Sequence, residues 1–247
     1  MQFTILRFDS LPSTNDEAAR QAKLGANEGV CIVAGQQTAG RGRRERIWHS
    51  PADAGLYFSL ILRPKFEMQK LPLITLAAAV AVSDAISEAC DLATDIKWAN
   101  DVFAGGKKLC GILAETVETE KKNAVVLGIG INLKKDAVAP ELNDVATSIE
   151  GETGNAPDAA KLLAGLTKNI EKNYQILHLT NGSEQIIELW TKRSSYAFGK
   201  MVRVTLENET FEGVTCGLVP TGALRVRAEN GLIKVVHAGD VVSLRRQ

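Results

Sequence analysis

The chain has 247 residues, and its 29 Lys and Arg balance 29 Asp and Glu to a formal net charge of zero. Hydrophobic residues make up 45% and charged residues 23%, the proportions of a folded globular protein, which excludes an intrinsically disordered chain. The neutral total argues against a surface that binds nucleic acid or anionic lipid all over, although it is compatible with a local basic patch.

Nothing in the sequence predicts a membrane segment, a secretion signal or a zinc site. The longest apolar stretch, residues 71–82, is too short to span a bilayer, and Ser83 and Asp84 follow it directly. The N-terminus lacks a basic segment followed by a long apolar one, so no signal peptide is expected. The cysteines at 31, 90, 110 and 216 form no CxxC pair, which favours reduced thiols in a cytoplasmic protein.

The first 90 residues predict alternating strands and helices. Strands are expected from alternating or apolar patterns at residues 4–8, 30–37 and 56–62. Helices are expected at residues 13–24, where Gly25 supplies the stop, and at residues 72–90. A turn at residues 10–12 and a long loop at residues 38–54 complete this part.

The middle of the chain predicts a compact β region followed by helices. Extended segments are expected at residues 95–98, 102–104, 107–118 and 123–133, with a hairpin turn at Gly105-Gly106. A polar loop is expected at residues 134–156 and helices at about 157–194. The predicted class is therefore α+β, with a central mixed or antiparallel sheet and helices around it.

The composition changes near residues 195–199. Five short alternating segments follow, separated by Gly, Asn and Pro, and this pattern is typical of a small five-stranded β-barrel. Two domains are therefore predicted, one over residues 1–196 and one over residues 197–247.

Residues 40–48, GRGRRERIW, carry four arginines against one glutamate and form the most unusual stretch; we call it the arginine loop. Its like charges repel one another, so the loop is expected to be mobile until an anion binds. The glycines let backbone amides approach that anion, and arginine forks match phosphate and carboxylate geometry. A solvated basic loop or an RNA-contacting patch is the alternative interpretation.

Two further stretches combine a structural and a functional interpretation. Lys97, Asp101 and Lys108 are ionisable groups in apolar β sequence, which favours side chains that point into a cleft, although rim positions would also explain them. Ser13-Thr14-Asn15 fits a helix cap, with Glu17 completing a capping box, and its polar groups also suit a ligand. The stretch GIGINL at 128–133 is no dinucleotide fingerprint, and no P-loop is present.

In this order, the motifs resemble those of the biotin protein ligases, and the resemblance covers essentially the whole chain. It is carried by Ser13-Thr14-Asn15, Gln37 to Arg44 with Trp48 after it, Lys97-Trp98-x-Asn100-Asp101, Lys108 to Glu115, Gly130-Ile131-Asn132 and a small barrel beginning at Gly199. The resemblance implies a class II synthetase-like ligase domain followed by an SH3-like barrel.

Three departures from the family pattern affect these expectations. Ala99 stands where the family usually has proline, and Glu45 stands where many members have glycine. The chain also starts directly at the catalytic domain, so we expect the short type of ligase, without the N-terminal DNA-binding domain of the repressor-type members.

The resemblance implies a two-step reaction. Biotin's carboxylate is joined to the α-phosphate of ATP with Mg²⁺, and biotin then passes to a lysine of the biotin carboxyl carrier protein or domain of acetyl-CoA carboxylase. By resemblance, Lys108 and Arg43 should hold the carboxylate and α-phosphate oxygens. Asp101 should bind metal or orient the incoming amine.

The resemblance also implies binding roles for further residues. Ser13, Thr14, Asn15 and Gln37 are expected on the ureido side, with Gly111 and Leu113 lining the same pocket. Arg41 and Arg46 are expected to help close the loop over the ligand, with Trp48 near the adenylate. Gly40, Gly42 and Arg43 are further residues expected to bind the ligand. The nucleotide side is expected to involve Asn100, Lys108 and Asn132.

Two rival functions stay open on the sequence alone. A lipoate ligase would share the fold class and the adenylation chemistry, although the arginine loop and the C-terminal barrel favour biotin. A biotin-sensing or RNA-binding module without catalysis is the second, and the intact Lys108, Arg43 and Asn100-Asp101 argue against it. Neither the magnesium ligands nor the choice between monomer and homodimer follows from the sequence.

Overall fold

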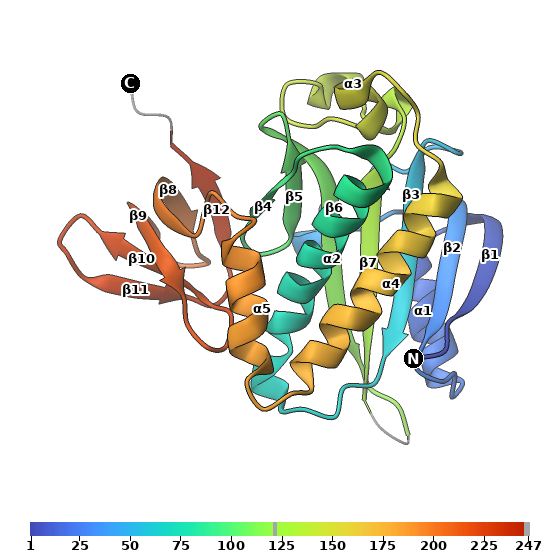
Figure 1. The fold of residues 1–247 in the computed structure, drawn as a ribbon, viewed down its shortest axis with the longest axis horizontal. Coiled ribbons are helices and arrows are strands. Elements are labelled where there is room, and N and C mark those ends of the chain that lie inside the picture. The colour runs from blue at the N-terminus through green and yellow to red at the C-terminus, as the bar shows by residue number, and fades with distance from the viewer. Residues whose placement is uncertain (121–122, 245–247) are drawn as a thin grey trace.

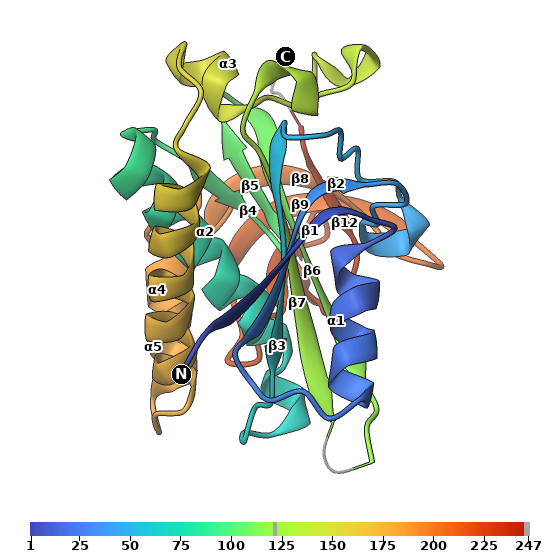
Figure 2. The same cartoon turned by 90° about the vertical axis from the view of Figure 1, so that its right-hand side faces the viewer.

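The fold, taken from a computed structural model, places a larger sheet-and-helix domain beside a smaller all-β domain (Figure 1). The structure describes residues 1–120 and 123–244, apart from the side chains of Glu45 and Met68. Helices cover both faces of the larger sheet, which Figure 2 shows edge-on between them. The predicted α+β class with a mixed central sheet is thereby confirmed.

The larger sheet has seven strands, in the order β1-β2-β3-β7-β6-β5-β4. Their bounds are β1 Thr4–Leu11, β2 Val30–Gln37, β3 Gly55–Leu62, β4 Asp95–Lys97, β5 Asp101–Ala104, β6 Lys107–Val117 and β7 Ala124–Asn132. Only the pair β1·β2 is parallel, because α1 (Thr14–Lys23) returns the chain between them. The other neighbouring strands are antiparallel.

The helices α2 (Pro72–Cys90), α4 (Ala159–Leu177) and α5 (Gly182–Thr191) form the layer on one face. By length and composition alone α2 could cross a membrane, whereas the sequence indicated that the apolar stretch was too short. In the structure, 67% of its most apolar 18 residues are buried inside the fold. It packs against α4, α5 and the sheet, so its apolar character is explained by its place at the centre of the core.

On the opposite face, α1 packs alone. Its cap is Ser13, whose hydroxyl accepts a hydrogen bond from the backbone N–H of Asp16 at 3.4 Å. Ala18 and Ala22 are fully buried against β2, β3 and β7, and these small side chains bring the helix close to the sheet. The first turn of α1 therefore lies over the middle strands, with Thr14 and Asn15 buried.

The structure differs from the sequence prediction at three places. Residues 10–11, predicted as a turn, extend β1. Trp98 lies after the end of β4 in a turn, and the peptide bond from Trp98 to Ala99 is cis. The predicted loop 134–156 contains a short helix, α3 (Ile149–Thr153), which Ser148 caps at 3.0 Å and Ile149 anchors in the core. Five residues are too few to show a helical period in the sequence.

The C-terminal part forms a five-stranded antiparallel sheet. Its strands are β8 Phe198–Thr205, β9 Thr210–Leu218, β10 Leu224–Ala228, β11 Ile233–Val236 and β12 Asp240–Ser243, in the order β11-β10-β9-β8-β12. Over the described residues β11 and β12 end this order without pairing with each other, so the antiparallel sheet is confirmed and the SH3-like barrel is not. Gly222 packs on Leu73 and Leu76 of α2, and Trp98 Nε1 donates to its carbonyl at 2.9 Å.

Gly165 lies in the interior of α4, and Gly165→Ala is expected to raise the free energy of unfolding by about 0.5–1 kcal/mol. A Cβ there would meet only Ala85, at 3.8 Å, so no side chain has to move. Urea titration followed by circular dichroism measures the change. Gly154→Ala is the contrasting variant. Gly154 has φ +78°, which an alanine adopts only with strain, so this substitution is expected to lower the free energy of unfolding although the space around Gly154 is open. A destabilised Gly165→Ala would contradict the packing described for α4.

All four cysteines are free, as predicted, and they differ in burial. Burial raises the pKa of Cys31 to about 12 and raises that of Cys110 further, so both stay protonated in the folded state. Iodoacetamide at pH 8 is therefore expected to modify Cys90 and Cys216 and to leave Cys31 and Cys110 intact, as peptide mass mapping would show. The same reagent should reach all four once urea unfolds the chain. Rapid modification of Cys110 in the folded protein would contradict its place in β6.

Candidate functional site

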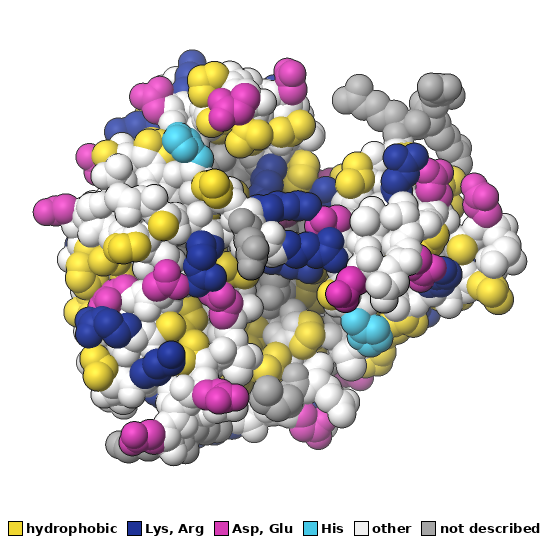
Figure 3. Space-filling view, turned by 180° about the vertical axis from the view of Figure 1, so that it is seen from behind, with side chains coloured by type: hydrophobic (Ala, Val, Ile, Leu, Met, Phe, Trp, Pro, Cys, Tyr) yellow, Lys and Arg dark blue, Asp and Glu magenta, His cyan; other side chains and the backbone are white. Residues whose placement is uncertain are grey.

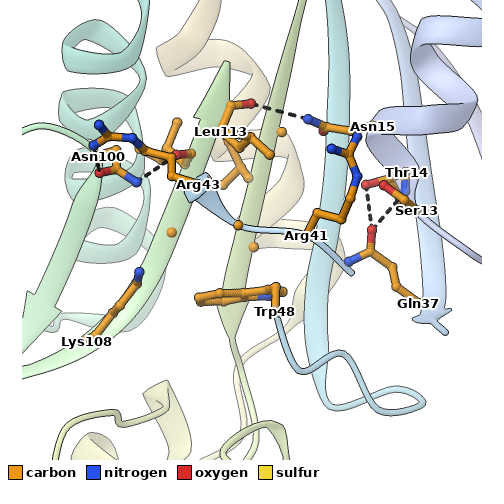
Figure 4. A pocket seen from close by; sticks show the side chains of 16 residues that line it. Ser13, Thr14, Asn15, Gln37, Arg41, Arg43, Trp48, Asn100, Lys108 and Leu113 are labelled. Carbon is orange, nitrogen blue, oxygen red and sulfur yellow. Dashed lines mark hydrogen bonds between the residues drawn. The ribbon is translucent and has the colours of Figure 1, made fainter. Parts of the chain in front are cut away.

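Two cavities meet beneath the arginine loop on the α1 side of the larger sheet. The first cavity lies between α1, β6 and β7 and the second between the arginine loop and the segment 137–146; with their open mouths they span about 480 Å³ and about 980 Å³. Five residues line both cavities and therefore form the boundary between them: Gly42, Arg43, Trp48, Asn100 and Lys108. Figure 4 shows the first cavity with Lys108 and Arg43 on one side and Ser13, Thr14 and Gln37 on the other.

The polar end of the first cavity is held by hydrogen bonds between α1 and the end of β2. Gln37 Oε1 accepts from the backbone N–H of Thr14 at 2.8 Å and from its hydroxyl at 3.0 Å. Ser13 is 2% exposed, and its hydroxyl proton is free to donate because its oxygen serves as the cap acceptor. This end thus presents fixed donors and acceptors to a small polar ring.

Three glycines on β6 and β7 make room for the side chains around the first cavity. A Cβ at Gly128 would lie 2.1 Å from Asn15 Oδ1, and a Cβ at Gly130 would lie 2.4 Å from Trp48 Nε1. A Cβ at Gly111 would approach the Trp48 ring to 3.0 Å. Sequence reasoning treated Gly128 and Gly130 as part of an incomplete dinucleotide motif, and Gly130 as part of a family motif, but it missed their role in making room for these side chains. Their spacing of two on a strand was the available signal, because it places both on one face.

Carboxylates pair with three of the four arginines in the arginine loop. Arg41 lies 2.6 Å from Asp16 and 3.1 Å from Glu115. Arg44 and Arg46 both pair with Asp240 of the C-terminal sheet, at 3.1 Å and 2.5 Å. The sequence suggested that these arginines repel one another, and it gave no sign of partners so far along the chain. Whether the loop moves before an anion binds stays a prediction.

Arg43 is the exception among the loop arginines. Its Nη1 donates to Asn100 Oδ1 at 2.9 Å, and Asn100 Nδ2 donates to the carbonyl of Ile112 at 3.0 Å. No ion pair with a carboxylate is found for Arg43 among the described residues. Burial lowers its pKa, while the charges of Asp240 and Asp101 oppose that shift. Arg43 therefore presents a partly desolvated charge at the boundary of both cavities, as an anion site requires.

Lys108 presents the second cation at this boundary. Its Nζ lies 2.7 Å from Asp101 and 5.4 Å from the centre of the Trp48 ring. Trp48 Nε1 is buried and has no hydrogen-bond partner among the described atoms, so the ring brings an unpaired donor to this boundary. Lys97 lines neither of these two cavities; it lies opposite Asp101 in the β4·β5 pair, and burial lowers its pKa.

The second cavity combines charged and apolar walls. Asp101, Arg46, Asp240 and Asn132 line it with the five boundary residues. Asn132 Nδ2 donates to the carbonyl of Thr147 at 2.9 Å and so helps to hold the segment that forms the far wall. The apolar lining residues were missed by sequence reasoning; they are Ile47, Ala137, Val138, Leu142, Val145 and Ala146. In the segment 137–146, the available signal was the apolar residues within a stretch whose other residues are polar.

Of the residues to which the family resemblance gave a binding or catalytic role, only Gly40 lines neither of these two cavities. The first cavity takes Ser13, Thr14, Asn15, Gln37, Arg41, Gly42, Arg43, Trp48, Asn100, Lys108, Gly111 and Leu113, and the second adds Arg46, Asp101 and Asn132. The carbonyl of Gly40 accepts from the N–H of Trp48 at 2.9 Å, and a Cβ there would lie 2.5 Å from the Trp48 carbonyl. Gly40 thus supports the loop from outside. Where Glu45 directs its side chain lies outside what the structure describes.

Positive charge collects in the hollow between the two domains, as Figure 3 shows from the side of the arginine loop. The second cavity opens there, lined by Arg43, Arg46 and Lys108 against Asp101 and Asp240. The neutral total of the chain is thus compatible with a local cationic site. Such a site binds a polyanionic small ligand more readily than a long nucleic acid, which needs a continuous basic surface.

Comparisons with known proteins agree along the whole chain. The family model described as "Biotin/lipoate A/B protein ligase family" matches residues 7–132, and "Biotin protein ligase C terminal domain" matches residues 197–243. The bifunctional ligase/repressor BirA of Bacillus subtilis is 40% identical over 242 residues, which cover 96% of this chain and 73% of that relative. The biotin–[acetyl-CoA-carboxylase] ligase of Mycobacterium tuberculosis is 35% identical over 240 residues, covering 94% of this chain and 86% of the relative.

Solved structures agree with the sequence comparison. The biotin protein ligase from Aquifex aeolicus in complex with biotin and ATP matches with a TM-score of 0.84 at 30% identity, covering 98% of this chain and 99% of that chain. The apo structure of the Aquifex aeolicus protein matches with a TM-score of 0.81 at 26% identity, covering 99% and 100%. The likeness therefore includes both domains.

Proposed function

The chain belongs to the biotin protein ligase family, and from its two cavities we infer how its residues divide the work of that ligase. It is an ATP-dependent ligase that activates biotin and transfers it to a carboxylase. We propose that the acceptor is one lysine of the biotin carboxyl carrier protein or domain. The family matches confirm the resemblance to biotin protein ligases that the sequence motifs indicated.

We place biotin in the first cavity and the nucleotide in the second. The donors and acceptors of Ser13, Thr14 and Gln37 suit the ureido ring, and the apolar walls of the second cavity suit a nucleobase. One observation carries the proposal: Lys108 and Arg43 line both cavities. The carboxylate of one ligand and the α-phosphate of the other would therefore meet at these two cations.

In the first step an oxygen of the biotin carboxylate attacks the α-phosphorus. The bond from that phosphorus to the bridging oxygen breaks, and pyrophosphate leaves with the bonding electrons. The carboxylate is already ionised at neutral pH, so no general base is needed. The barrier comes from bringing two anions together, and Lys108 and Arg43 offset it by fixing positive charge beside the α-phosphate oxygens.

Mg²⁺ is proposed to enter with the phosphates of ATP. No group of three or more His, Cys, Asp or Glu that could form a metal cage is found in the described part of the chain. Asp101 and Asp240 line the second cavity, and sites for Mg²⁺ with nucleotides commonly use one or two carboxylates together with the phosphates. These residues therefore fit the ion, which would neutralise phosphate charge when bound.

In the second step the neutral amine of the carrier lysine attacks the acyl carbon. The bond from that carbon to the phosphate oxygen breaks, AMP leaves, and the nitrogen loses a proton. At a reference pKa of about 10.4, only about one lysine in 10³ is neutral at pH 7. We assign Asp101 to orient this amine and accept its proton, because its carboxylate lines the second cavity beside Lys108, where the acyl carbon would lie. A rate–pH profile of transfer that is unchanged in Asp101→Ala would exclude this role.

We also propose that the ligase acts in the cytoplasm, with no DNA-binding role and no membrane association. The four free cysteines support a reducing compartment. For assembly, we propose a homodimer by strand pairing, because β1 and β4 end the larger sheet without a further partner in the described residues. Light scattering at several protein concentrations distinguishes this dimer from a monomer.

Incubation with a biotin carboxyl carrier domain, MgATP and either biotin or lipoate tests the proposed function. A gain in carrier mass with biotin and none with lipoate is the expected result. A gain with lipoate alone would favour the rival ligase of the same family. No gain with either acid, under conditions in which the carrier accepts biotin from another ligase, would contradict both.

A further inference from the structure

We propose that Glu115 is a positioning residue that connects the arginine loop to the biotin-binding wall of the first cavity. Glu115 lies on β6, its side chain is 33% exposed, and it lines neither cavity. One carboxylate oxygen accepts from Arg41 at 3.1 Å, and the other accepts from Asn15 Nδ2 at 2.6 Å. A residue that touches no ligand thus bridges the loop and the wall. The inference rests on biotin occupying the first cavity.

The contact with Glu115, together with a longer one of 3.5 Å to the carbonyl of Leu113, fixes the direction of the Asn15 amide. An ionised carboxylate only accepts hydrogen bonds, so Nδ2 must face Glu115 and Oδ1 must face Ser59, whose hydroxyl lies 2.7 Å away. Asn15 is only 6% exposed, and Gly128 leaves just enough room beside its Oδ1. The amide therefore has one supported orientation, and of the two acceptors that Nδ2 faces, Glu115 at 2.6 Å is the closer and the charged one.

From Asn15 the hydrogen bonds continue around the cavity wall and return to the arginine loop. The Ser59 hydroxyl is also 2.8 Å from Thr14 Oγ1, and it donates its single proton to one of the two acceptors at a time. Thr14 donates to Gln37, as described above. Gln37 Nε2 donates to Ser50 Oγ at 2.9 Å, and Ser50 Oγ donates to the Trp48 carbonyl at 3.1 Å.

Both ends of this series, Arg41 and Trp48, belong to the arginine loop, while its middle members Asn15, Thr14 and Gln37 line the first cavity. Charge-assisted bonds are the stronger members of such networks, so loss of the Glu115 carboxylate should loosen the amide and Arg41 together. Biotin bound to the middle of the series would then hold the loop less firmly.

Asp16 provides a matched control on the same arginine. Its carboxylate lies 2.6 Å from Arg41, closer than that of Glu115. The Asp16 side chain is 56% exposed, lines neither cavity and has no hydrogen bond to Asn15 among those found in the described residues. Asp16→Asn therefore weakens the hold on Arg41 alone, whereas Glu115→Gln weakens the hold on both Arg41 and Asn15.

Calorimetric titration of biotin into the wild type, Glu115→Gln and Asp16→Asn tests the proposal. We expect the Kd for biotin to rise about tenfold in Glu115→Gln and less than about threefold in Asp16→Asn. At saturating biotin, the kcat of adenylate formation in Glu115→Gln should stay within about twofold of the wild type, because Glu115 contacts no reacting atom. Thermal unfolding of each variant shows that it is folded at the temperature of the titration.

Two outcomes would overturn the proposal: an unchanged Kd in folded Glu115→Gln, or an equal rise in both variants, which would reduce the effect to the Arg41 ion pair. A large loss of kcat with an unchanged Kd would overturn it as well. If the wild type itself bound no biotin, the placement of biotin in the first cavity would be wrong. Failure of the proposed function is therefore seen in the wild type alone, whereas failure of the role of Glu115 is seen only in the comparison of the variants.

Discussion

Lys108→Gln is expected to slow adenylate formation by about 10²–10³-fold, the loss found when one fixed charge-stabilising group is removed from an active site. Glutamine keeps most of the length of lysine but carries no charge, so the repulsion between carboxylate and α-phosphate is no longer offset. Lys108 is 32% exposed at the side chain and lies at the cavity boundary, so the fold should tolerate the change. Release of pyrophosphate with biotin and MgATP measures this step without the carrier.

The adjacent lysine is the control for Lys108→Gln. Lys107 Nζ donates to the carbonyl of Asn143 at 2.6 Å, and it lines neither cavity. Lys107→Gln removes the same charge from the same hairpin and should change the rate by less than about threefold. If both variants lost activity equally, the effect would belong to the general field of the hairpin and the role assigned to Lys108 would be wrong.

Arg43→Gln has the second of the two largest expected effects, a loss of about 10²-fold or more in kcat/KM for ATP during adenylation. Arg43 is the loop arginine that forms no ion pair with a carboxylate in the described structure, so its guanidinium remains available to the α-phosphate. Glutamine can still donate to Asn100, which preserves the local contact while removing the charge. Initial rates of pyrophosphate release over a range of ATP concentrations measure the effect.

The matched control is Arg44→Gln, one residue along the same loop. Arg44 pairs with Asp240 at 3.1 Å, and neither of the two cavities includes it among its lining residues. Loss of this exposed ion pair should cost less than about fivefold. Equal losses in Arg43→Gln and Arg44→Gln would contradict the distinction between them and would indicate that the loop acts only through its total charge.

Much of the fold could be predicted from the sequence because its elements follow local rules. The strands and the long helices were recognisable from apolar period and from the residues at their ends. The order of the strands was not, because β3 pairs with its sequence neighbour β2 on one edge but with the distant β7 on the other. The short helix α3 was missed because Ile149 alone anchors it.

The candidate site was predictable to the extent that its residues sit in short motifs. Gly128 and Gly130 were missed because their role depends on Asn15 and Trp48, which come from distant segments. Asp240 was missed for the same reason, since it lies 194 residues from its partner Arg46. Contacts of this kind depend on how distant segments pack, within the larger domain for the glycines and between the two domains for Asp240, and no local sequence pattern predicts them.

The pairing of β3 with β7 has a consequence for how the chain is made. Leu62 of β3 pairs with Val125 of β7, so one edge of β3 stays open while the residues between them are synthesised. At about 5–20 residues per second, this interval lasts roughly 3–13 s. All residues of β3 after its first are buried in the finished sheet, so an apolar strand edge is exposed to other nascent chains during that time. Faster elongation through this interval should therefore raise the yield of soluble protein.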